Sequence, residues 1–382
     1  MRNANKRFLI LVAALLVGAL VFAGCGSSAD PTEAPTAAPT AAPTEAPTEA
    51  PTEAPTEAPT EAPTEAPTEA PIEPVLVYTN PLTGEVLEQP QTTRIFGVTI
   101  NNIPAALPHS GAGQADLFFE MFVNDYATRG LAFYADITQV EKIGSVRSMR
   151  YNFTDLAVAY DAVIAHAGGS DEVLKDANRS KVTHFNISTD TETTYAVRDK
   201  GRLNDGYAWE HCLFAKGQGL YDYLEKEGKR VTRDETKEYG LNFTEDGTPA
   251  DGTDAGKIDI IFNLYGNKKQ STLTYSADLG KYVFTQYGKQ IDSVKEENLE
   301  AFENVFIILA KVTNKDVYHV ADLLGSGDGY YACGGKVIAI RWHHAKESDP
   351  ITFTLADGTP LFQGIGNSYI AIAPTTSSIS FE

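Results

Sequence analysis

Cysteine is scarce in this chain of 382 residues, which contains only three. They stand at Cys25, Cys212 and Cys333, so far apart that no pair has the spacing of a zinc site and no disulfide framework exists. This excludes a disulfide-rich secreted scaffold and a cysteine-based zinc domain. The sequence leaves open whether Cys212 and Cys333 form a single bridge.

Positive charge is also in short supply. The chain has 31 Lys and Arg residues against 51 Asp and Glu residues, which gives a formal net charge of -20. About half of that excess belongs to a proline-rich segment before residue 75, but the remainder of the chain is still acidic. An acidic domain repels the phosphate backbone and anionic lipid headgroups, so we expect no nucleic-acid partner and no flat binding to lipid.

The motifs of established enzymes are missing as well. No Gly-x-Ser-x-Gly elbow surrounds any serine, and Asp246, Asp251 and Asp254 lack the spacing of an EF-hand calcium loop. The sequence therefore predicts no metal site, identifies no cofactor and names no reaction.

Residues 1–24 are predicted to be a targeting signal. Three basic residues precede an apolar run over residues 8–22, which is too short to favour a permanent membrane span. The following Ala23-Gly24-Cys25 resembles the lipobox of bacterial lipoproteins, where the signal peptidase cuts before a cysteine that carries the lipid. Phe22 stands where that pattern usually has leucine. The resemblance implies lipidation at Cys25, and the alternative is an ordinary secretory signal with an incidental cysteine.

Residues 25–74 form a low-complexity linker built on Pro-Thr-Glu-Ala repeats. Proline at every fourth position prevents helix and sheet and favours extended polyproline II. The glutamates repel one another and keep the segment solvated. We therefore expect a spacer that holds a lipid-anchored domain away from the outer face of the membrane.

The remaining residues predict an α+β fold with two parts. Residues 75–240 show mixed α/β character, and residues 257–382 show short strands that are mostly antiparallel. Strands are expected at residues 94–100, 115–123, 130–136, 162–165, 258–264, 271–275, 281–286, 305–312, 336–342 and 369–373. Helices are expected after Arg150, after Ser170 as an N-cap, and over residues 217–227.

Arg147, Ser148 and Arg150 form the strongest candidate site. Two guanidinium forks three residues apart suit phosphate, sulfate or carboxylate, and the start of a helix adds backbone N–H groups. The structural alternative is that both arginines are paired to Asp155, Asp161 or Glu120.

The region around these arginines also resembles the YerB family of lipoproteins from Gram-positive bacteria. The resemblance covers nearly all of residues 75–374 and rests on the following residues: Asn80-Pro-Leu-Thr-Gly84; Asn102, Pro108, Ser110 and Gly111; Ala115, Asp116 and Glu120; Thr128 and Arg129; residues 143–150 with Asp155, Asp161 and His166; Gly168-Gly-Ser170; Gly280-Lys-Tyr-Val-Phe284; residues 304–309; and residues 334–338 with Trp342. The chain departs from the family pattern at Leu107, His109, Ser145 and Tyr369, where arginine, glutamine, proline and tryptophan are usual.

The resemblance implies an uncharacterised two-part domain with no established reaction. It adds Asn102, Glu120, Arg129 and Ser170 to the candidate binding residues. His166 and His211 are the candidate catalytic bases, although a lone buried histidine is more often a core residue.

Two functions remain open from the sequence. The first is an envelope lipoprotein that binds a wall polymer, a peptide or another protein. The second is an envelope hydrolase or transferase acting on a phosphodiester or glycan, with His166 or His211 as base.

Overall fold

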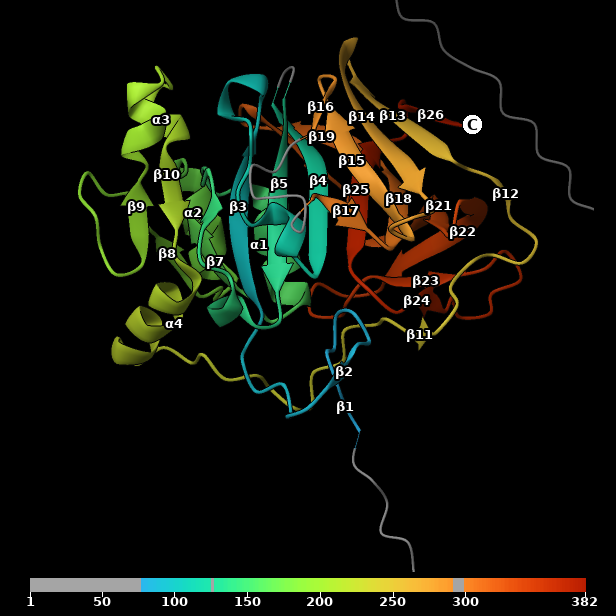
Figure 1. Cartoon of the computed structure of the whole chain (residues 1–382), viewed down its shortest axis with the longest axis horizontal. Helices are drawn as coiled ribbons and strands as arrows, with labels where there is room; N and C mark the ends of the chain where they lie inside the picture. The colour runs from blue at the N-terminus through green and yellow to red at the C-terminus, as the bar shows by residue number, and fades with distance from the viewer. Residues whose placement is uncertain (1–76, 125–126, 291–298) are drawn as a thin grey trace, which may run out of the picture. The chain divides into compact units, whose positions relative to one another are not determined.

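Eleven strands of the folded part form one mixed sheet, shown in Figure 1. The computed structural model describes residues 77–124, 127–290 and 299–382. The sheet runs in the order β12 (Thr253–Asp254), β22 (Lys336–His344), β21 (Gly325–Cys333), β18 (Asn304–Ala310), β25 (Ser368–Pro374), β4 (Leu117–Asn124), β5 (Ala127–Tyr134), β3 (Phe96–Asn102), β7 (Val163–His166) and β8 (His184–Asn186), with β23 (Thr352–Thr354) paired to β22.

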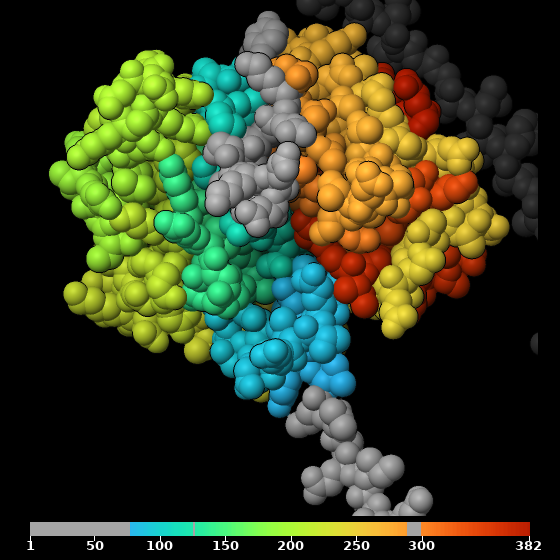
Figure 2. Space-filling view, viewed as in Figure 1, coloured from blue at the N-terminus to red at the C-terminus, as the bar shows by residue number. Residues whose placement is uncertain are grey.

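Strands from both halves of the sequence meet in the middle of this sheet. β25 lies parallel to β4, with Ser368 opposite Leu117, and parallel to β18 on its other side. Figure 2 shows the green N-terminal residues and the orange-to-red C-terminal residues on opposite sides of one face. The described residues therefore belong to one compact unit, and the bounds 75–240 and 257–382 stay a prediction from the sequence.

A second sheet of six strands has the order β16 (Lys289–Gln290), β15 (Lys281–Gln286), β14 (Asn267–Ser276), β13 (Lys257–Leu264) and β26 (Ser378–Phe381), with β17 (Ala301–Phe302) paired to β15. β13 alternates half-buried and buried residues throughout its length, so it presents one face to the core. Phe262 and Phe284 of this sheet share a core with Phe118 and Phe122 of β4. The second sheet thus covers one face of the large sheet.

The helices pack on both faces of the large sheet. The α-helices are α1 (Tyr151–Ala159), α2 (Asp171–Arg179), α3 (Lys200–Asn204) and α4 (Gly217–Lys226). Phe153 and Leu156 of α1 pack in a core with Phe119 and Met121 of β4. Because successive strand residues point to opposite faces, β4 contributes to both cores. The odd-numbered residues of β4 face α1, and the even-numbered residues face the second sheet.

Short elements complete the fold. A three-stranded sheet contains β6 (Ile143–Gly144), β10 (Leu213–Ala215) and β9 (Ala196–Arg198). Three two-stranded pairs are β1 (Tyr78–Thr79) with β2 (Val86–Leu87), β11 (Phe243–Thr244) with β24 (Gln363–Gly364), and β19 (Val312–Lys315) with β20 (Tyr318–Ala321). Single 3₁₀ turns are η1 (Pro104–Ala106), η2 (Ala112–Gln114), η3 (Ile137–Gln139) and η4 (Trp209–His211).

The predicted α+β fold is confirmed, with helices in the N-terminal half and mostly antiparallel strands in the C-terminal half. The strand predicted at residues 305–312 is divided into β18 and β19. β21 was missed because Gly325, Gly327 and Gly329 give it the composition of a turn. Cys212 and Cys333 are both buried and free. The predictions for residues 1–74, Cys25 included, lie outside the described residues.

No helix in the part of the chain that the structure describes is both long and apolar enough to span a membrane.

Candidate functional site

Three arginine side chains converge where β5 meets the start of α1. Arg129 lies on β5, and Arg147 and Arg150 lie on the segment that leads into α1. The Arg129 Nη1 donates to the carbonyl of Ser148 at 3.0 Å, and the Arg150 Nη1 donates to the carbonyl of Met149 at 2.7 Å. We call Arg129, Arg147 and Arg150 the arginine cluster.

The positive charge of this cluster is poorly balanced. Arg147 has one carboxylate near it, the Oε1 of Glu210 at 3.7 Å, and that side chain is 49% exposed. Among residues 77–124, 127–290 and 299–382, no ion pair joins Arg129 or Arg150 to an acid. A buried cation without a counter-ion is unfavourable, because desolvation is not offset by attraction.

The acids that the sequence offered as structural partners are bound elsewhere. The Oδ1 of Asp161 forms ion pairs with the Nη2 of Arg94 at 2.9 Å and with the Nη2 of Arg230 at 2.6 Å. Asp155 accepts from the amide of Asn152 at 3.0 Å. Glu120 is paired with a lysine of the second sheet. Among the described residues, Arg147 and Arg150 are therefore not paired to Asp155, Asp161 or Glu120, as the structural alternative required.

Burial and mutual repulsion both lower the pKa values of Arg129 and Arg150. Burial, followed by the charges of Arg150 and Arg147, holds the pKa of Arg129 well below its usual range. Burial also lowers the pKa of Arg150, with Tyr318 opposing that shift and Arg147 adding to it. An anion placed among the three guanidinium groups relieves this repulsion.

The start of α1 adds to the positive electrostatic potential at the arginine cluster. Arg150 occupies the N-cap position without a side-chain cap, and the first turn contains no acidic residue. The positive end of the helix dipole is thus not neutralised by an acid of that turn.

The C-terminal half of the chain also contributes side chains to the surroundings of the arginine cluster. The ring of Tyr318 on β20 lies under Arg150, with the guanidinium carbon 4.5 Å from the ring centroid. The Nζ of Lys315 lies 3.8 Å from the ring centroid of Tyr151, whose hydroxyl donates to Asp316 at 2.5 Å. The hairpin of β19 and β20 therefore packs on the start of α1, and both halves build the site.

Family models match both halves of the chain. Residues 82–230 match "Protein of unknown function (DUF3048) N-terminal domain", and residues 260–370 match the C-terminal domain of the same description. The chain belongs to the DUF3048 family. This confirms the two-part family resemblance that the sequence suggested.

One relative and one solved structure agree with the family. The chain is 27% identical over 315 residues to the protein described as "Putative lipoprotein YerB" of Bacillus subtilis (strain 168), covering 79% of this chain and 88% of that protein. It also resembles the crystal structure of the YerB protein from Bacillus subtilis with a TM-score of 0.66 and 24% identity, covering 79% of this chain and 99% of that chain. The second comparison supports the fold alone.

Within this DUF3048 fold, Asn102 and Glu120 lie apart from the arginine cluster. Both are fully buried and face the second sheet. Glu120 is paired with Lys269 and accepts from Ser271 at 2.7 Å and Tyr369 at 2.5 Å. Asn102 donates to Glu120 at 2.8 Å. Burial alone raises the pKa of Glu120, but Lys269 and these hydrogen bonds outweigh it, so the pKa lies below its ordinary value.

Successive side chains of a strand point to opposite faces of the sheet, which explains why Asn102 and Glu120 lie apart from the arginine cluster. Thr128 pairs with Asn102 and faces the second sheet, so its neighbour Arg129 points to the opposite face. Tyr369, one of the predicted departures from the family pattern, provides the hydroxyl that reaches Glu120. We assign Asn102 and Glu120 to a buried network that joins the two halves.

Ser170 acts as a helix cap. Its hydroxyl accepts from the backbone N–H of Val173 at 3.4 Å, and Asp171 and Glu172 occupy the first turn of α2. Ser148 contributes its carbonyl to Arg129 and remains part of the arginine cluster's surroundings.

His166 is held on both ring nitrogens. Its Nδ1 lies 2.7 Å from the carbonyl of Gly168, which only accepts, so Nδ1 carries the proton. Its Nε2 then accepts from the Nδ1 of His184 at 3.0 Å. Burial, with repulsion from His184, lowers the pKa of His166 to about 4. No lone pair is left for a general base.

The depressed pKa of His166 predicts acid sensitivity. The unfolded state takes up a proton near pH 6.5, whereas the folded state does so only near pH 4. Stability from His166 is therefore complete above pH 6.5 and is lost as the pH falls toward 4, by roughly 3 kcal/mol in all. Urea unfolding of the wild type and of His166→Asn at several pH values measures it. If the free energy of unfolding changes with pH in the same way in both proteins, His166 is not the group responsible for the acid sensitivity.

His211 lies beside the cluster, since its neighbour Glu210 contacts Arg147. Its Nδ1 is 2.9 Å from the amide nitrogen of Asn101. Burial lowers the pKa of His211, with Glu210 opposing that shift. The ring also lines a surface cavity of about 650 Å³ together with Leu107 and Tyr207. His211 and Glu210 thus adjoin the arginine cluster.

Reasoning from the sequence did not include Lys269 or Tyr318 in the site. Lys269 was detectable, because it stands in phase with the inward-facing Ser271 and Leu273 of β14. Tyr318 left no local signal, because its contact with Arg150 depends on tertiary packing. Within the described residues, no group of three or more His, Cys, Asp or Glu side chains is arranged to hold a metal ion.

Proposed function

We propose that this chain is a lipid-anchored binding protein of the cell envelope that holds an anionic group of its ligand at the arginine cluster. The observation that carries the proposal is the convergence of Arg129, Arg147 and Arg150, which among the described residues have one ion pair to an acid, that of Arg147 with the half-exposed Glu210. Guanidinium groups bind phosphate, sulfate and carboxylate through paired, charge-assisted hydrogen bonds. The ligand is a wall component, a peptide or another envelope protein that carries such a group.

The anchoring part of the proposal rests on the N-terminal sequence and on the relative. Cys25 would carry the lipid at the outer face of a Gram-positive membrane, and residues 25–74 would space the domain from it. The relative of Bacillus subtilis is described as a lipoprotein, which supports membrane anchoring.

Changing the lipidation site tests the anchor. Cys25→Ala is expected to remove the lipid and shift the protein to the medium or to an uncleaved precursor, because no acyl chain holds it to the bilayer. Fractionation of cells followed by intact-mass measurement reads the outcome. A processed variant that stays on the membrane would contradict lipidation at Cys25.

The enzyme alternative depends on His211. His166 has both nitrogens engaged, whereas His211 adjoins the arginines and a surface cavity. A hydrolase or transferase of a phosphodiester or glycan would use the arginines to stabilise negative charge. Among the described residues no group of side chains is arranged to hold a metal ion, and the free thiol of Cys212 beside His211 is buried, which raises its pKa. Binding is therefore the function that we favour.

Calorimetric titration of the mature protein tests the binding function. Inorganic phosphate and sulfate serve as probes, and N-acetylglucosamine, which is uncharged, serves as the comparison. Saturable binding of an anion that weakens as sodium chloride rises is expected, because salt screens exposed charges. Absence of anion binding at low salt would overturn the proposed site.

A further inference from the structure

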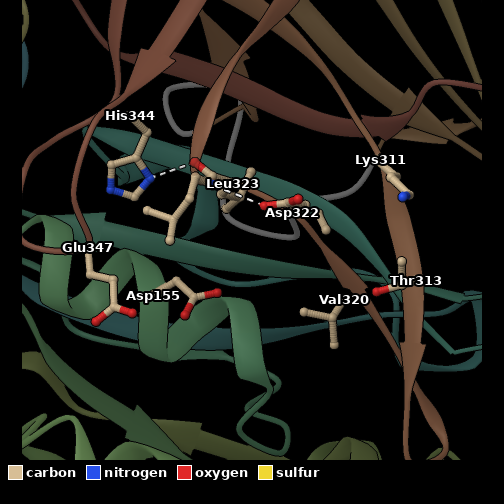
Figure 3. Close-up of a pocket in the computed structure, with 10 residues that line it drawn as sticks. Asp155, Lys311, Thr313, Val320, Asp322, Leu323, His344 and Glu347 are labelled. Atoms are coloured by element: carbon tan, nitrogen blue, oxygen red, sulfur yellow. Dashed lines mark hydrogen bonds between the residues drawn. The ribbon is translucent and has the colours of Figure 1, made fainter. Parts of the chain in front are cut away.

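A second cavity, lined by none of the three arginines of the cluster, lies between α1 and strands of the C-terminal half (Figure 3). It has a volume of about 280 Å³, which suits a molecule of a few heavy atoms. α1 contributes Asp155, the hairpin of β19 and β20 contributes Thr313 and Val320, and the end of β22 contributes His344. Like the arginine cluster, the cavity is therefore built by both halves of the chain.

The cavity is polar at two ends of opposite character. Figure 3 shows Asp155 and Glu347 near each other on one side and Lys311 with Thr313 on the other. Leu323 and the carboxylate of Asp322, which accepts from the backbone N–H of Leu324 at 3.3 Å, lie between these ends, and Val320 lies beside Thr313. A ligand that complements the two ends carries a cationic group and an anionic group.

His344 provides an unused acceptor at this cavity. Its Nδ1 lies 2.8 Å from the carbonyl of Leu323, so Nδ1 carries the proton and Nε2 of the neutral ring is an acceptor. The residue is 1% exposed, and Nε2 has no hydrogen-bond partner among the described residues. A buried acceptor without a donor is unfavourable, so a ligand N–H that reaches it is favoured.

In the part of the chain that the structure describes, no ion pair joins Asp155 to a cation. Its carboxylate accepts from Asn152 at 3.0 Å. Burial, with repulsion from Asp176 and Glu347, raises the pKa of Asp155 to about 6, and Lys315 opposes the shift. A bound ammonium group would lower that pKa again and stabilise the ionised carboxylate.

We propose that this cavity binds a small zwitterion, an amino acid or a short amino-alkanoic acid, with its ammonium group toward Asp155, Glu347 and His344 and its carboxylate toward Lys311. The acceptors match the three donors of a primary ammonium, and the lysine and the Thr313 hydroxyl match a carboxylate. This site is independent of the arginine cluster and of the function proposed for it.

Calorimetric titration of the mature protein with a series of probes of increasing length tests the inference. The probes are glycine, 4-aminobutanoate and 6-aminohexanoate, compared with hexylamine and hexanoate, which each carry one charge. We expect one zwitterion to bind at least about tenfold more tightly than either singly charged probe. Binding should weaken as the pH falls below about 6, because protonation of Asp155 removes the charge that faces the ammonium.

Two variants and one control locate the binding. Asp155→Asn is isosteric and removes a buried charge, so it should fold and weaken the zwitterion at least about tenfold. Lys311→Met should lower the affinity for the zwitterion to the affinity for hexylamine. Asp171→Asn, at an exposed acid outside the cavity, should change nothing. No binding by any zwitterion, hexylamine binding as tightly as the best zwitterion, or unchanged affinity in Asp155→Asn would each overturn the proposal.

Discussion

Lys269→Met is expected to lower the free energy of unfolding by about 3–5 kcal/mol, because it leaves the Glu120 carboxylate buried without its counter-ion. Both side chains are at most 1% exposed, and the pair joins the second sheet to β4 of the large sheet. Water cannot replace the lost ammonium at such a depth. Chemical denaturation followed by circular dichroism measures the loss, and methionine keeps most of the lysine volume so that packing is disturbed least.

The pair Glu120→Gln/Lys269→Met is the matched control for that result. It removes both charges and keeps an amide for Ser271 and Tyr369, so it should recover a substantial part of the lost stability. The single variant should also gain stability relative to the wild type as the pH falls from 7. The stranded Glu120 has a raised folded pKa, so protonation stabilises the folded state. A single variant as stable as the wild type would contradict a structural pair.

Arg147→Ala/Arg150→Ala is expected to weaken binding of inorganic phosphate at least about a hundredfold while leaving the fold intact. Each charge-assisted hydrogen bond contributes about 1.5–3 kcal/mol, and two arginines are removed. Stability should change little, because Arg147 has only the half-exposed Glu210 and Arg150 gives up a carbonyl and the Tyr318 ring. Loss of repulsion with Arg129 acts in the opposite, stabilising direction.

Calorimetry and thermal unfolding of the same protein separate the two roles of these arginines. Arg179→Ala, at an exposed arginine of α2, is the control for a general loss of positive charge. Arg147→Lys/Arg150→Lys keeps the charge and loses the forked donors, so intermediate binding is expected. A double alanine variant that melts many degrees lower would show that the arginines hold the core and that the site assignment is wrong.

Local sequence patterns were enough to place most elements near the site. The apolar residues Phe153, Leu156 and Tyr160 predicted α1, and the polar cap Ser170 predicted the start of α2. These signals are short-range, because they depend on helix periodicity and on backbone donors within one turn. The glycine-rich β21 escaped the same reasoning, because its strand character comes from pairing with β18 and β22 rather than from its own residues.

The sequence by itself determined the spacing of Arg147 and Arg150 and the acidic balance of the domain. Tertiary structure alone decided which acids meet which bases. Asp161, Glu120 and Asp155 were equal candidates in the sequence, yet they pair with Arg94, Lys269 and Asn152. Ion pairs form across distances in sequence that no local pattern records. Arg129 and Glu120 also lie on different faces, because strand alternation turns one to α1 and the other to the second sheet.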